Sequence, residues 1–333
     1  MDDSATELDR LIHDPLNLTK EFVNEWLATG EFITAHTSGS TGQPKSIRLL
    51  KTDMRHSALA TCRIFGITQA DTLYLPLSPD YIAGKMMIVR AFVSGATLIV
   101  DKPSNTQCGC RNSRITLAAI VPSQIEGFLQ NTPTGNCHYL IVGGGSISPS
   151  RHKLLAERTD IKAFSTYGMT ETCSHVALCR LSAGAQPNRF KALPGITFSL
   201  DNRECLVINA PDYSFKNLVT NDIAKLLSPQ EFILKGRIDN VINSGGLKLH
   251  PEIIEKAIAH LIVNPFYITW RPSEKWEQEA ILVIEADDNG EYNSERLMQQ
   301  IHTVLPDREC PKEIYFQPKL SRTASGKIIR IHK

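Results

Sequence analysis

The sequence predicts an α/β protein in which a large α/β domain is followed by a small α+β domain. Short apolar runs rich in β-branched residues alternate with segments of helical spacing along the first half of the chain. The pattern of strand-like and helix-like segments changes around residues 236–246, and a second, shorter α/β pattern follows. With 333 residues and 42% hydrophobic content, the chain is long enough to form two separate cores.

The large domain is predicted from five short strands and the helices between them. Its strands are expected at 72–78 (TLYLPLS), 96–101 (ATLIVD), 117–122 (LAAIVP), 139–144 (YLIVGG) and 162–168 (KAFSTYG). Segments 51–65 and 149–159 have helix-compatible spacing. After Gly195 strands and turns dominate, with strands expected at 204–211 (ECLVINAP) and 231–237 (EFILKGR).

The small domain is predicted from the pattern after residue 240. Helices are expected near 251–261 and 294–304, and strands at 267–272, 280–287 and 313–318. We therefore place the large domain at 1–236, a connecting segment at 237–240 and the small domain at 241–333.

Composition excludes several classes of protein. A formal net charge of +1 is not the excess positive charge expected of a protein that binds nucleic acid or an anionic membrane. No apolar run approaches the length of about 20 residues that a membrane span requires. The acidic start, MDDSATELDRLIHDPLN, does not have the pattern of a secretory signal. The eight cysteines are scattered, without the spacing of a disulfide framework or a zinc site. We expect a soluble cytoplasmic protein with reduced thiols that takes a small-molecule partner.

The segment TSGSTGQPKS, residues 37–46, is the first candidate binding element. It nearly matches the phosphate loop G-x-x-x-x-G-K-[ST], but Pro44 stands where the second glycine is required. Proline fixes φ and donates no N–H, which disfavours a P-loop phosphotransferase. The hydroxyls and Lys45 can still hold a polyphosphate; the alternative is a surface Gly/Ser linker.

Four further segments follow in order and decide between these alternatives. They are LIVGGGSIS (140–148), STYGMTETCS (165–174), GRIDNVINSGGLKLHPEIIE (236–255) and SRTASGKIIR (321–330). Together with TSGSTGQPKS they resemble the signature motifs of the adenylate-forming superfamily of acyl-CoA synthetases, adenylation domains and luciferases. The resemblance runs from about residue 33 to the C-terminus. It implies a large nucleotide-binding domain and a small mobile C-terminal domain.

The resemblance also implies a reaction and a substrate class. Members of this superfamily use ATP and Mg²⁺ to convert a carboxylic acid to an acyl-adenylate, and many then pass the acyl group to CoA. The TETCS motif is most similar to the o-succinylbenzoate–CoA ligases, which implies o-succinylbenzoate as the acid. Residues 1–36 precede the phosphate loop where relatives carry a longer region, so the large domain is expected to be N-terminally shortened.

Motif by motif, the resemblance assigns residues to the nucleotide. Contacts to the β- and γ-phosphates are implied for Thr37, Ser38, Gly39, Ser40, Thr41, Gly42 and Lys45. The resemblance implies that Gly143, Gly144 and Gly145 form a wall beside the adenine. Without the resemblance, the same glycines would be read as an ordinary turn between a strand and a helix. Tyr167 would stack on adenine, Thr170 would contact the α-phosphate and Glu171 would help to bind Mg²⁺. Asp222, in a TND that replaces the usual T-G-D, and Arg237 would contact the ribose.

A two-step reaction requires the small domain to move, and the resemblance assigns residues to that movement. Asp239 in GRID would be the hinge, and Lys327 in ASGK would be the lysine that the small domain supplies to the first step. Gly245 and Gly246 would flank the path of the CoA thiol in the second step. Without the motif, Lys327 would belong to an ordinary basic tail.

The acid-binding region departs from the family pattern. Many relatives have P-x-F-H-x-x-G after the strand at 72–78, whereas this chain has PLSPDYIAGK, with Tyr81 in place of the histidine. Lys85 could pair with a second carboxylate, and Ser174 and His175 could border the acid. A surface lysine and a capping serine are the alternatives.

Three functions remain after this reasoning, of which the first two are enzymes of this superfamily and the third belongs to a different class. The first is an ATP-dependent acid–CoA ligase, either for o-succinylbenzoate or for another aryl or acyl group. The second is an adenylation enzyme that loads a carrier protein. The third is a non-catalytic nucleotide-binding protein, against which the retention of both Glu171 and Lys327 argues, because a binder needs neither.

Overall fold

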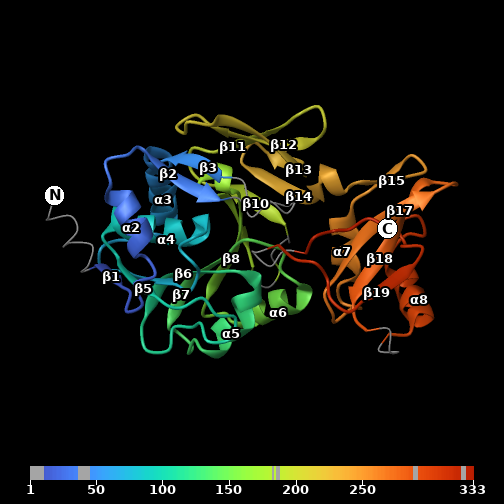
Figure 1. The fold of residues 1–333 in the computed structure, drawn as a ribbon, viewed down its shortest axis with the longest axis horizontal. Coiled ribbons are helices and arrows are strands. Elements are labelled where there is room, and N and C mark those ends of the chain that lie inside the picture. The colour runs from blue at the N-terminus through green and yellow to red at the C-terminus, as the bar shows by residue number, and fades with distance from the viewer. Residues whose placement is uncertain (1–10, 37–45, 182–183, 185–187, 288–291, 324–327) are drawn as a thin grey trace.

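The computed structural model describes residues 11–36, 46–181, 184, 188–287, 292–323 and 328–333. It contains a large body and a smaller one built from the C-terminal part of the chain, which is orange to red in Figure 1. Each body has its own sheet and its own apolar core. The predicted fold class, α/β with a large and a small domain, is confirmed.

A 12-stranded sheet forms the large body. In spatial order its strands are β1 (Ile12–His13), β5 (Thr97–Val100), β4 (Thr72–Leu75), β6 (Ile115–Ile120), β7 (Cys137–Val142), β8 (Lys162–Gly168), β9 (His175–Arg180), β10 (Arg189–Ala192), β14 (Glu231–Arg237), β13 (Lys216–Ser228), β12 (Cys205–Ala210) and β11 (Thr197–Leu200). The strands from β1 to β8 in this order are parallel, and pairing becomes antiparallel from β8–β9 onward. The parallel half follows from the alternation of strands and helices in the sequence.

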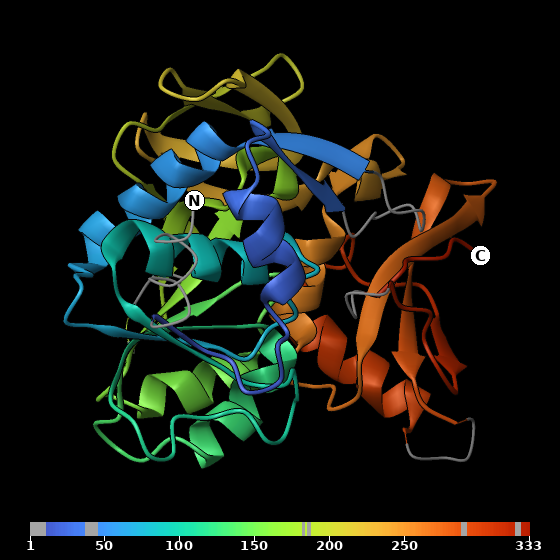
Figure 2. The ribbon, with the colours of Figure 1, turned by 60° about the vertical axis from the view of Figure 1, so that its left-hand side comes forward.

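Helices cover both faces of the parallel half (Figures 1 and 2). On one face lie α3 (Lys51–Phe65) and α4 (Ile82–Ser94); on the other lie the 3₁₀ turn η1 (Pro122–Gln124), α5 (Ile125–Gln130) and α6 (Pro149–Glu157). Alternation along β4 shows the two cores: Leu73 and Leu75 join one cluster, and Tyr74 joins Phe128 in the other. The remaining elements are α2 (Lys20–Leu27) and the hairpin of β2 (Phe32–His36) and β3 (Ser46–Leu50).

Local sequence explains where the helices begin and end. Helices α3 and α4 stop at Gly66 and Gly95, whose φ angles of 63° and 71° lie in the left-handed region that glycine adopts without strain. Helix α6 begins with Ser148, whose Oγ accepts the Arg151 N–H at 3.3 Å, and with Pro149 in its first turn.

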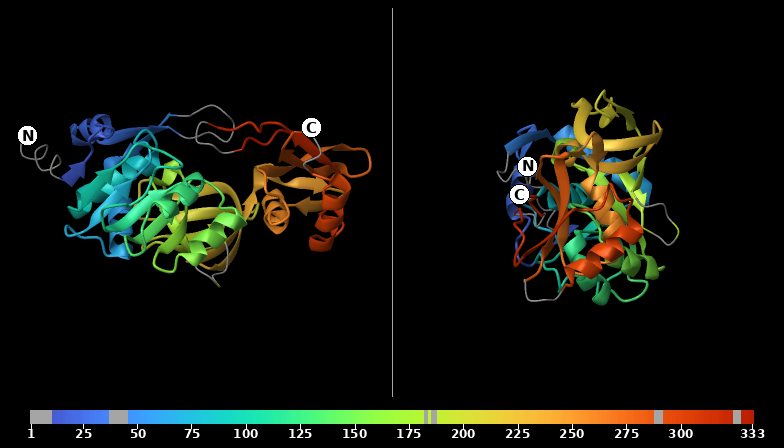
Figure 3. Two further views of the ribbon diagram at one scale, coloured as in Figure 1. Left: turned by 90° about the horizontal axis from the view of Figure 1, so that it is seen from below. Right: turned by 90° about the vertical axis from the view of Figure 1, so that its right-hand side faces the viewer.

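The small body has a five-stranded sheet with helices on one face. Its elements are β15 (Ile242–Ser244), β16 (Leu247–Leu249), α7 (Pro251–Ile258), β17 (Phe266–Ser273), β18 (Glu277–Glu285), α8 (Ser294–Val304) and β19 (Ile314–Gln317). The opposite face, with Tyr267 and Val283, is covered by Leu320 from the C-terminal segment. The red ribbon of that segment extends from the small body toward the large one (Figure 3).

The two sheets meet at the predicted domain boundary. Strand β14 ends at Arg237, the 3₁₀ turn η3 occupies Ile238–Asn240, and β15 begins at Ile242. Helix α7 of the small body packs against β14, and Asn240 Nδ2 donates to Glu252 of that helix. Residues 238–241 make the covalent link between two separately packed cores.

The predicted strands and helices occur in the structure with ends shifted by a few residues, as for 251–261, observed as Pro251–Ile258. Several elements lie outside the prediction: α4, β9, β10 and the 13-residue β13. Helix α4 is buried along residues 84–91, so it has no polar stripe from which an amphipathic period could be read.

Candidate active site

Two groups of predicted site residues lie where parallel strands of the large sheet end. Gly143, Gly144 and Gly145 follow β7, and the 3₁₀ turn η2 (Thr170–Thr172) follows β8. Parallel strands share the edge at which their carboxyl ends lie, so these two connections are neighbours. A Cβ atom on Gly143 would lie 2.7 Å from Thr166 Oγ1, so a larger residue here would require the Thr166 hydroxyl to move.

A tight turn joins β8 to the antiparallel strand β9 and holds Thr170 and Glu171 in place. Within it, Cys173 has a φ of 62°, and the buried Thr172 Oγ1 lies 2.9 Å from the carbonyl oxygen of Met169 and 2.7 Å from that of Ser174. Gly168 permits the turn, because a Cβ there would lie 2.3 Å from the Ser174 carbonyl oxygen. Thr170 is half-buried and Glu171 is exposed, so both can be reached by a ligand.

Gly168→Ala is therefore expected to lower the free energy of unfolding by about 1–3 kcal/mol, through overpacking against backbone that cannot move aside. Gly145→Ala is the matched control, because its Cβ would meet only Pro122 Cγ at 3.8 Å. Thermal unfolding of the two variants checks this. Equal melting temperatures would contradict the described path of the turn.

Glu171 can serve as a metal ligand. It makes no hydrogen bond or ion pair with another described residue, so its carboxylate oxygens are available. Within the described part of the chain there is no group of three metal-ligating side chains. A single free carboxylate fits Mg²⁺ that shares its coordination shell with phosphate oxygens and water, and does not fit a metal held by protein alone.

Three predicted nucleotide contacts, from β8, β13 and β14, form a second cluster. Tyr167 donates its hydroxyl proton to Asp222 Oδ2 at 2.7 Å, and Arg237 Nη1 lies 3.5 Å from Asp222 Oδ1. The Tyr167 ring packs against Phe190 and Phe232, with centroids 5.7 and 5.0 Å away. Burial and the charge of Asp222 raise the pKa of Tyr167, so the phenol is a donor at neutral pH. Each Asp222 oxygen keeps a lone pair for a further donor, such as a sugar hydroxyl.

The predicted hinge residue is joined to this cluster. Asp239 accepts hydrogen bonds from Arg237 Nη2 at 2.6 Å and from Asn221 Nδ2 at 3.2 Å. Burial alone would lower the pKa of Arg237, but its hydrogen bond to Asp239 and the charge of Asp222 raise it, so the guanidinium stays charged. Asn221 stands where the resembling motif has glycine, and its side chain makes an additional contact to Asp239.

On the acid side, the structure places Lys85 and Tyr81 at the start of α4. Lys85 is 8% exposed; its Nζ lies 3.7 Å from Glu25 Oε2 and 4.5 Å from the centroid of the Phe22 ring. The ammonium group therefore already has a carboxylate partner in α2. Tyr81 is 38% exposed and directly precedes the helix. The roles predicted for both residues in binding the acid stay predictions.

Arg90, which the sequence analysis did not single out, lies further along α4 and faces the turn after β8. It is 2% exposed, and its Nη2 donates to Ser174 Oγ at 2.6 Å and lies 3.5 Å from His175 Nδ1. Its Nε is buried without a hydrogen-bond partner, and no carboxylate among the described residues pairs with it. Burial lowers the pKa of Arg90 to about 10, which leaves it charged at neutral pH.

An uncompensated buried cation is energetically unfavourable, so Arg90 marks a place where an anion is expected to bind. The sequence did contain a signal, because Arg90 is the single charged residue in the apolar run MMIVRAFV. Ser174 and His175, predicted from their position after the TETC segment, are the residues that the structure brings to this guanidinium.

Some predicted residues are not part of this described cluster. Thr37, Ser38, Gly39, Ser40, Thr41, Gly42, Lys45 and Lys327 lie outside the described residues. Gly245 and Gly246 form the turn between β15 and β16 in the small body, with φ angles of 55° and 81°. A Cβ on Gly245 would lie 2.4 Å from the Trp276 ring. The part predicted for both glycines in the CoA path stays a prediction.

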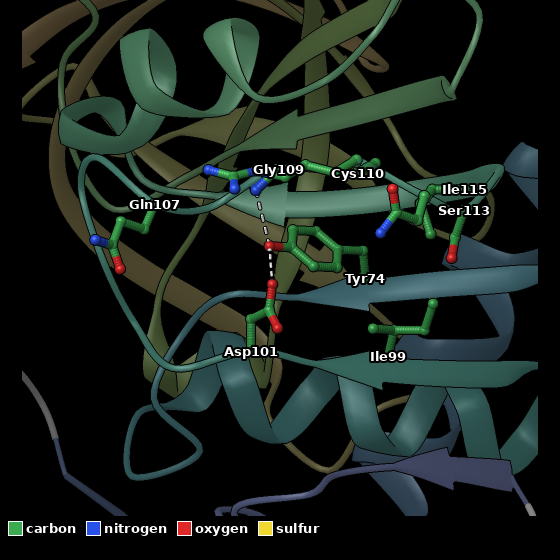
Figure 4. Close-up of a pocket in the computed structure, with 10 residues that line it drawn as sticks. Tyr74, Ile99, Asp101, Gln107, Gly109, Cys110, Ser113 and Ile115 are labelled. Atoms are coloured by element: carbon green, nitrogen blue, oxygen red, sulfur yellow. Dashed lines mark hydrogen bonds between the residues drawn. The ribbon is translucent and has the colours of Figure 1, made fainter.

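A pocket of about 470 Å³ lies apart from these residues, under the loop between β5 and β6 (Figure 4). Tyr74 projects into it, donates its hydroxyl proton to Asp101 Oδ2 at 2.6 Å and accepts the Gly109 N–H at 2.9 Å. Of the predicted site residues that the structure describes, none lines this pocket. The Tyr74 hydroxyl is already saturated by its two protein partners, so we assign the pocket no role in the reaction.

Comparisons with known proteins identify relatives of this chain in sequence and in fold. The family model described as AMP-binding enzyme matches residues 31–215. The chain is 26% identical over 340 residues to 2-succinylbenzoate–CoA ligase of Listeria monocytogenes, covering 93% of this chain and 71% of that protein. Among solved structures, it resembles an AMP-forming acyl-CoA synthetase/AMP-acid ligase II-like protein from Dyadobacter fermentans, with 32% identity, a TM-score of 0.63 and coverage of 95% and 93%.

The fold also matches O-succinylbenzoate coenzyme A synthetase from Bacillus subtilis in complex with ATP and magnesium, with a TM-score of 0.74 and 19% identity. That match covers 89% of this chain and 68% of the other. Along the described residues, no helix has the length and apolar character needed to cross a membrane.

Proposed function

Because this chain belongs to the AMP-binding enzyme family, we propose that it is an AMP-forming acid–CoA ligase whose acid is the dicarboxylate o-succinylbenzoate. The resemblance inferred from the motifs is thereby confirmed at the level of the family. The observation that carries the choice of acid is Arg90, a buried guanidinium without a carboxylate partner beside the turn that holds Thr170 and Glu171.

The reaction has two balanced steps. In the first, an oxygen of the substrate carboxylate attacks the α-phosphorus of ATP, a P–O bond forms, and pyrophosphate leaves with the electron pair of the broken bond. In the second, the CoA sulfur attacks the acyl carbon, a C–S bond forms, AMP leaves, and the thiol proton passes to solvent. The first step requires positioning and charge stabilisation at the α-phosphate.

The described residues suit these tasks. Tyr167, Asp222 and Arg237 would hold adenine and ribose, since they form one connected cluster with unused acceptor capacity. Thr170 would contact the α-phosphate, and Glu171 would bind Mg²⁺, which neutralises phosphate charge when bound. The segment 37–45 would receive the β- and γ-phosphates, with Gly143–Gly145 beside the adenine.

Arg90 would favour a dicarboxylic acid over a monocarboxylic one. One carboxylate of o-succinylbenzoate is the reacting group, and the other would bind the guanidinium through charge-assisted hydrogen bonds. Ser174 would line the same site, because its hydroxyl already accepts from Arg90 Nη2. A monocarboxylic acid would leave the cation buried and uncompensated.

The proposal is tested by acid-dependent formation of AMP with CoA across a panel of o-succinylbenzoate, benzoate, fatty acids and amino acids. Formation of o-succinylbenzoyl-CoA with the highest kcat/KM is expected. Thioester formed only on a carrier-protein phosphopantetheine would indicate a carrier-loading enzyme, and no acid-dependent AMP would indicate a nucleotide-binding protein.

We propose that residues 1–236 and 241–333 move as two units about the segment 237–240, with Asp239 as the pivot. Two separately packed cores joined by the short turn η3 support this arrangement. Between the two steps the small domain would rotate, removing Lys327 and bringing Gly245 and Gly246 to the CoA path.

Asp239→Pro is expected to spare adenylate formation and to slow thioester formation on the order of tenfold, because a fixed φ at the pivot restricts rotation. Both half-reactions are measured separately, by pyrophosphate exchange and by conversion of supplied acyl-adenylate. Asp239→Ala is the control, because it removes the carboxylate but leaves the backbone free. Unchanged thioester formation in the proline variant would place the pivot elsewhere.

We further propose that the reaction takes place in the cytoplasm. The eight cysteines, all of which lie in the described part of the chain, form no disulfide with one another and are buried, which suits a reducing compartment. ATP and free CoA, the co-substrates of the proposed reaction, are available there.

A further inference from the structure

His175, the first residue of β9, lies between Arg90 and helix α3. It is 6% exposed, and its two ring nitrogens face different partners. Nδ1 lies 3.5 Å from Arg90 Nη2 and 3.3 Å from Ser174 Oγ, and Nε2 lies 3.4 Å from Thr61 Oγ1. Thr61 Oγ1 in turn lies 3.1 Å from the carbonyl oxygen of Ser57, one helical turn earlier.

The chemistry of these partners favours one of the two neutral tautomers. A guanidinium can only donate hydrogen bonds, so its contact with Nδ1 at 3.5 Å favours Nδ1 as an acceptor, and the Ser174 hydroxyl, which accepts from Arg90 Nη2, can donate its own proton to the same nitrogen. A neutral imidazole then carries its proton on Nε2 and donates it to Thr61 Oγ1, whose own proton goes to the Ser57 carbonyl oxygen. In this series of hydrogen bonds, from Arg90 to the Ser57 carbonyl oxygen, each donor is matched with an acceptor. Burial, and then the charge of Arg90, lower the pKa of His175 well below its ordinary value, which keeps the ring neutral.

We propose that His175 is a positioning residue: its Nε2–H tautomer, fixed by Thr61, holds the Arg90 guanidinium in the orientation that receives the second carboxylate of the acid. This inference rests on the proposed function for its substrate. Arg90 has a long side chain in an apolar helix, and besides Ser174 and His175 its side-chain partner is the weak acceptor Met87 Sδ at 3.4 Å.

A neutral acceptor is better suited to this task than a carboxylate. An aspartate or glutamate in place of His175 would also orient the guanidinium, but it would neutralise the positive charge and compete with the substrate anion. The imidazole orients Arg90 and leaves its charge uncompensated until the acid binds. This separates the positioning of the cation from the binding of the anion.

The tautomer is tested without any acid. In the ¹⁵N spectrum of the protein labelled at histidine, the His175 ring, assigned by its loss in His175→Asn, is expected to show a protonated Nε2 and an unprotonated Nδ1 between pH 6 and 8. In Thr61→Val, whose side chain cannot accept the Nε2 proton, the signal is expected to shift. A protonated Nδ1 in the wild-type protein would overturn the proposal.

The effect on specificity is tested with o-succinylbenzoate and an aromatic monocarboxylic acid of similar size. His175→Phe is expected to raise KM for the dicarboxylate on the order of tenfold with little change in kcat, because the ground-state orientation of Arg90 is lost. KM for the monocarboxylic acid should stay the same. His175→Asn, whose amide oxygen can replace Nδ1 as acceptor, is expected to recover most of the loss.

Controls separate positioning from general damage. His152→Phe in α6 changes a histidine of the same domain that is far from Arg90 in the fold, and it should not alter the preference between the acids. If His175→Phe does not fold, Thr61→Val gives the same comparison, because Thr61 contacts His175 and makes no hydrogen bond to Arg90. If these variants keep the preference between the two acids, and the wild-type enzyme uses o-succinylbenzoate, this inference is overturned and the proposed function is not. A wild-type enzyme that ignores o-succinylbenzoate would overturn the proposed acid, and the ¹⁵N result would still decide the role of Thr61.

Discussion

Replacing Lys327 by alanine is expected to slow adenylate formation by ~10²–10³-fold, while conversion of a supplied acyl-adenylate to the thioester continues at nearly the wild-type rate. The first step develops negative charge around the α-phosphate, and loss of one stabilising contact in a transition state has an effect of this size. In the proposed two-conformation reaction, the second step would take place after the small domain has carried the lysine away.

The residues on either side of Lys327 are anchored in the small domain. Arg322 Nη1 donates to Glu285 Oε2 at 2.6 Å, and Arg330 forms an ion pair with Glu255 of α7. Backbone pairing continues this anchoring, since Ile329 N–H donates to the Ser321 carbonyl oxygen at 2.8 Å. Lys327 would therefore move with the small domain and not with the nucleotide site.

Separate assays of pyrophosphate exchange and of thioester formation check this prediction. Lys319→Ala is the matched control, because Lys319 is an exposed lysine of the same C-terminal segment. If Lys327→Ala slows both half-reactions equally, the two-conformation reaction is wrong for this enzyme.

Arg90→Met is expected to lower kcat/KM for o-succinylbenzoate on the order of 10²-fold, because two charge-assisted hydrogen bonds to the second carboxylate are lost. The same substitution should affect an aromatic monocarboxylic acid much less. Stability should stay the same or rise, because methionine fills a similar volume without burying an uncompensated charge. A loss of activity combined with retained stability would identify Arg90 as a binding residue.

Kinetics with both acids and thermal unfolding measure these effects. Lys85→Met is the companion variant, since Lys85 is a second buried cation of α4 but is already paired with Glu25. A larger loss of o-succinylbenzoate activity in Lys85→Met than in Arg90→Met would assign the second carboxylate to Lys85, as the sequence analysis expected. Equal losses for both acids in Arg90→Met would rule out its role in selecting a dicarboxylate.

The parallel half of the fold could be predicted because each of its strands is a short apolar run followed by a turn or a helix. Strand β13 could not, because Asn217, Asn221 and Asp222 interrupt the alternation of apolar and polar residues. Its pairing with β12 and β14 overrides weak local propensity. Helix α4 was missed for the opposite reason, since it is apolar around most of its circumference.

The nucleotide side of the candidate site could be read from the sequence because its residues belong to short contiguous motifs. The acid side could not, because Arg90 meets Ser174 and His175 across 84 and 85 residues of sequence. Sequence spacing gave no reason to connect an arginine in an apolar helix with the turn after β8. Only the folded structure brings them together, through the contacts of Arg90 with Ser174 and His175.

The burial of the cysteines has a practical consequence for observing the domain movement. All eight thiols are buried in the folded protein, so maleimide reagents should react slowly with the native chain. A cysteine introduced at Val263 in the small domain, where the side chain is 96% exposed, and another at Lys153 in α6, 79% exposed, would then react selectively. Fluorophores at these two positions would report the distance between the domains during turnover, without prior removal of native cysteines.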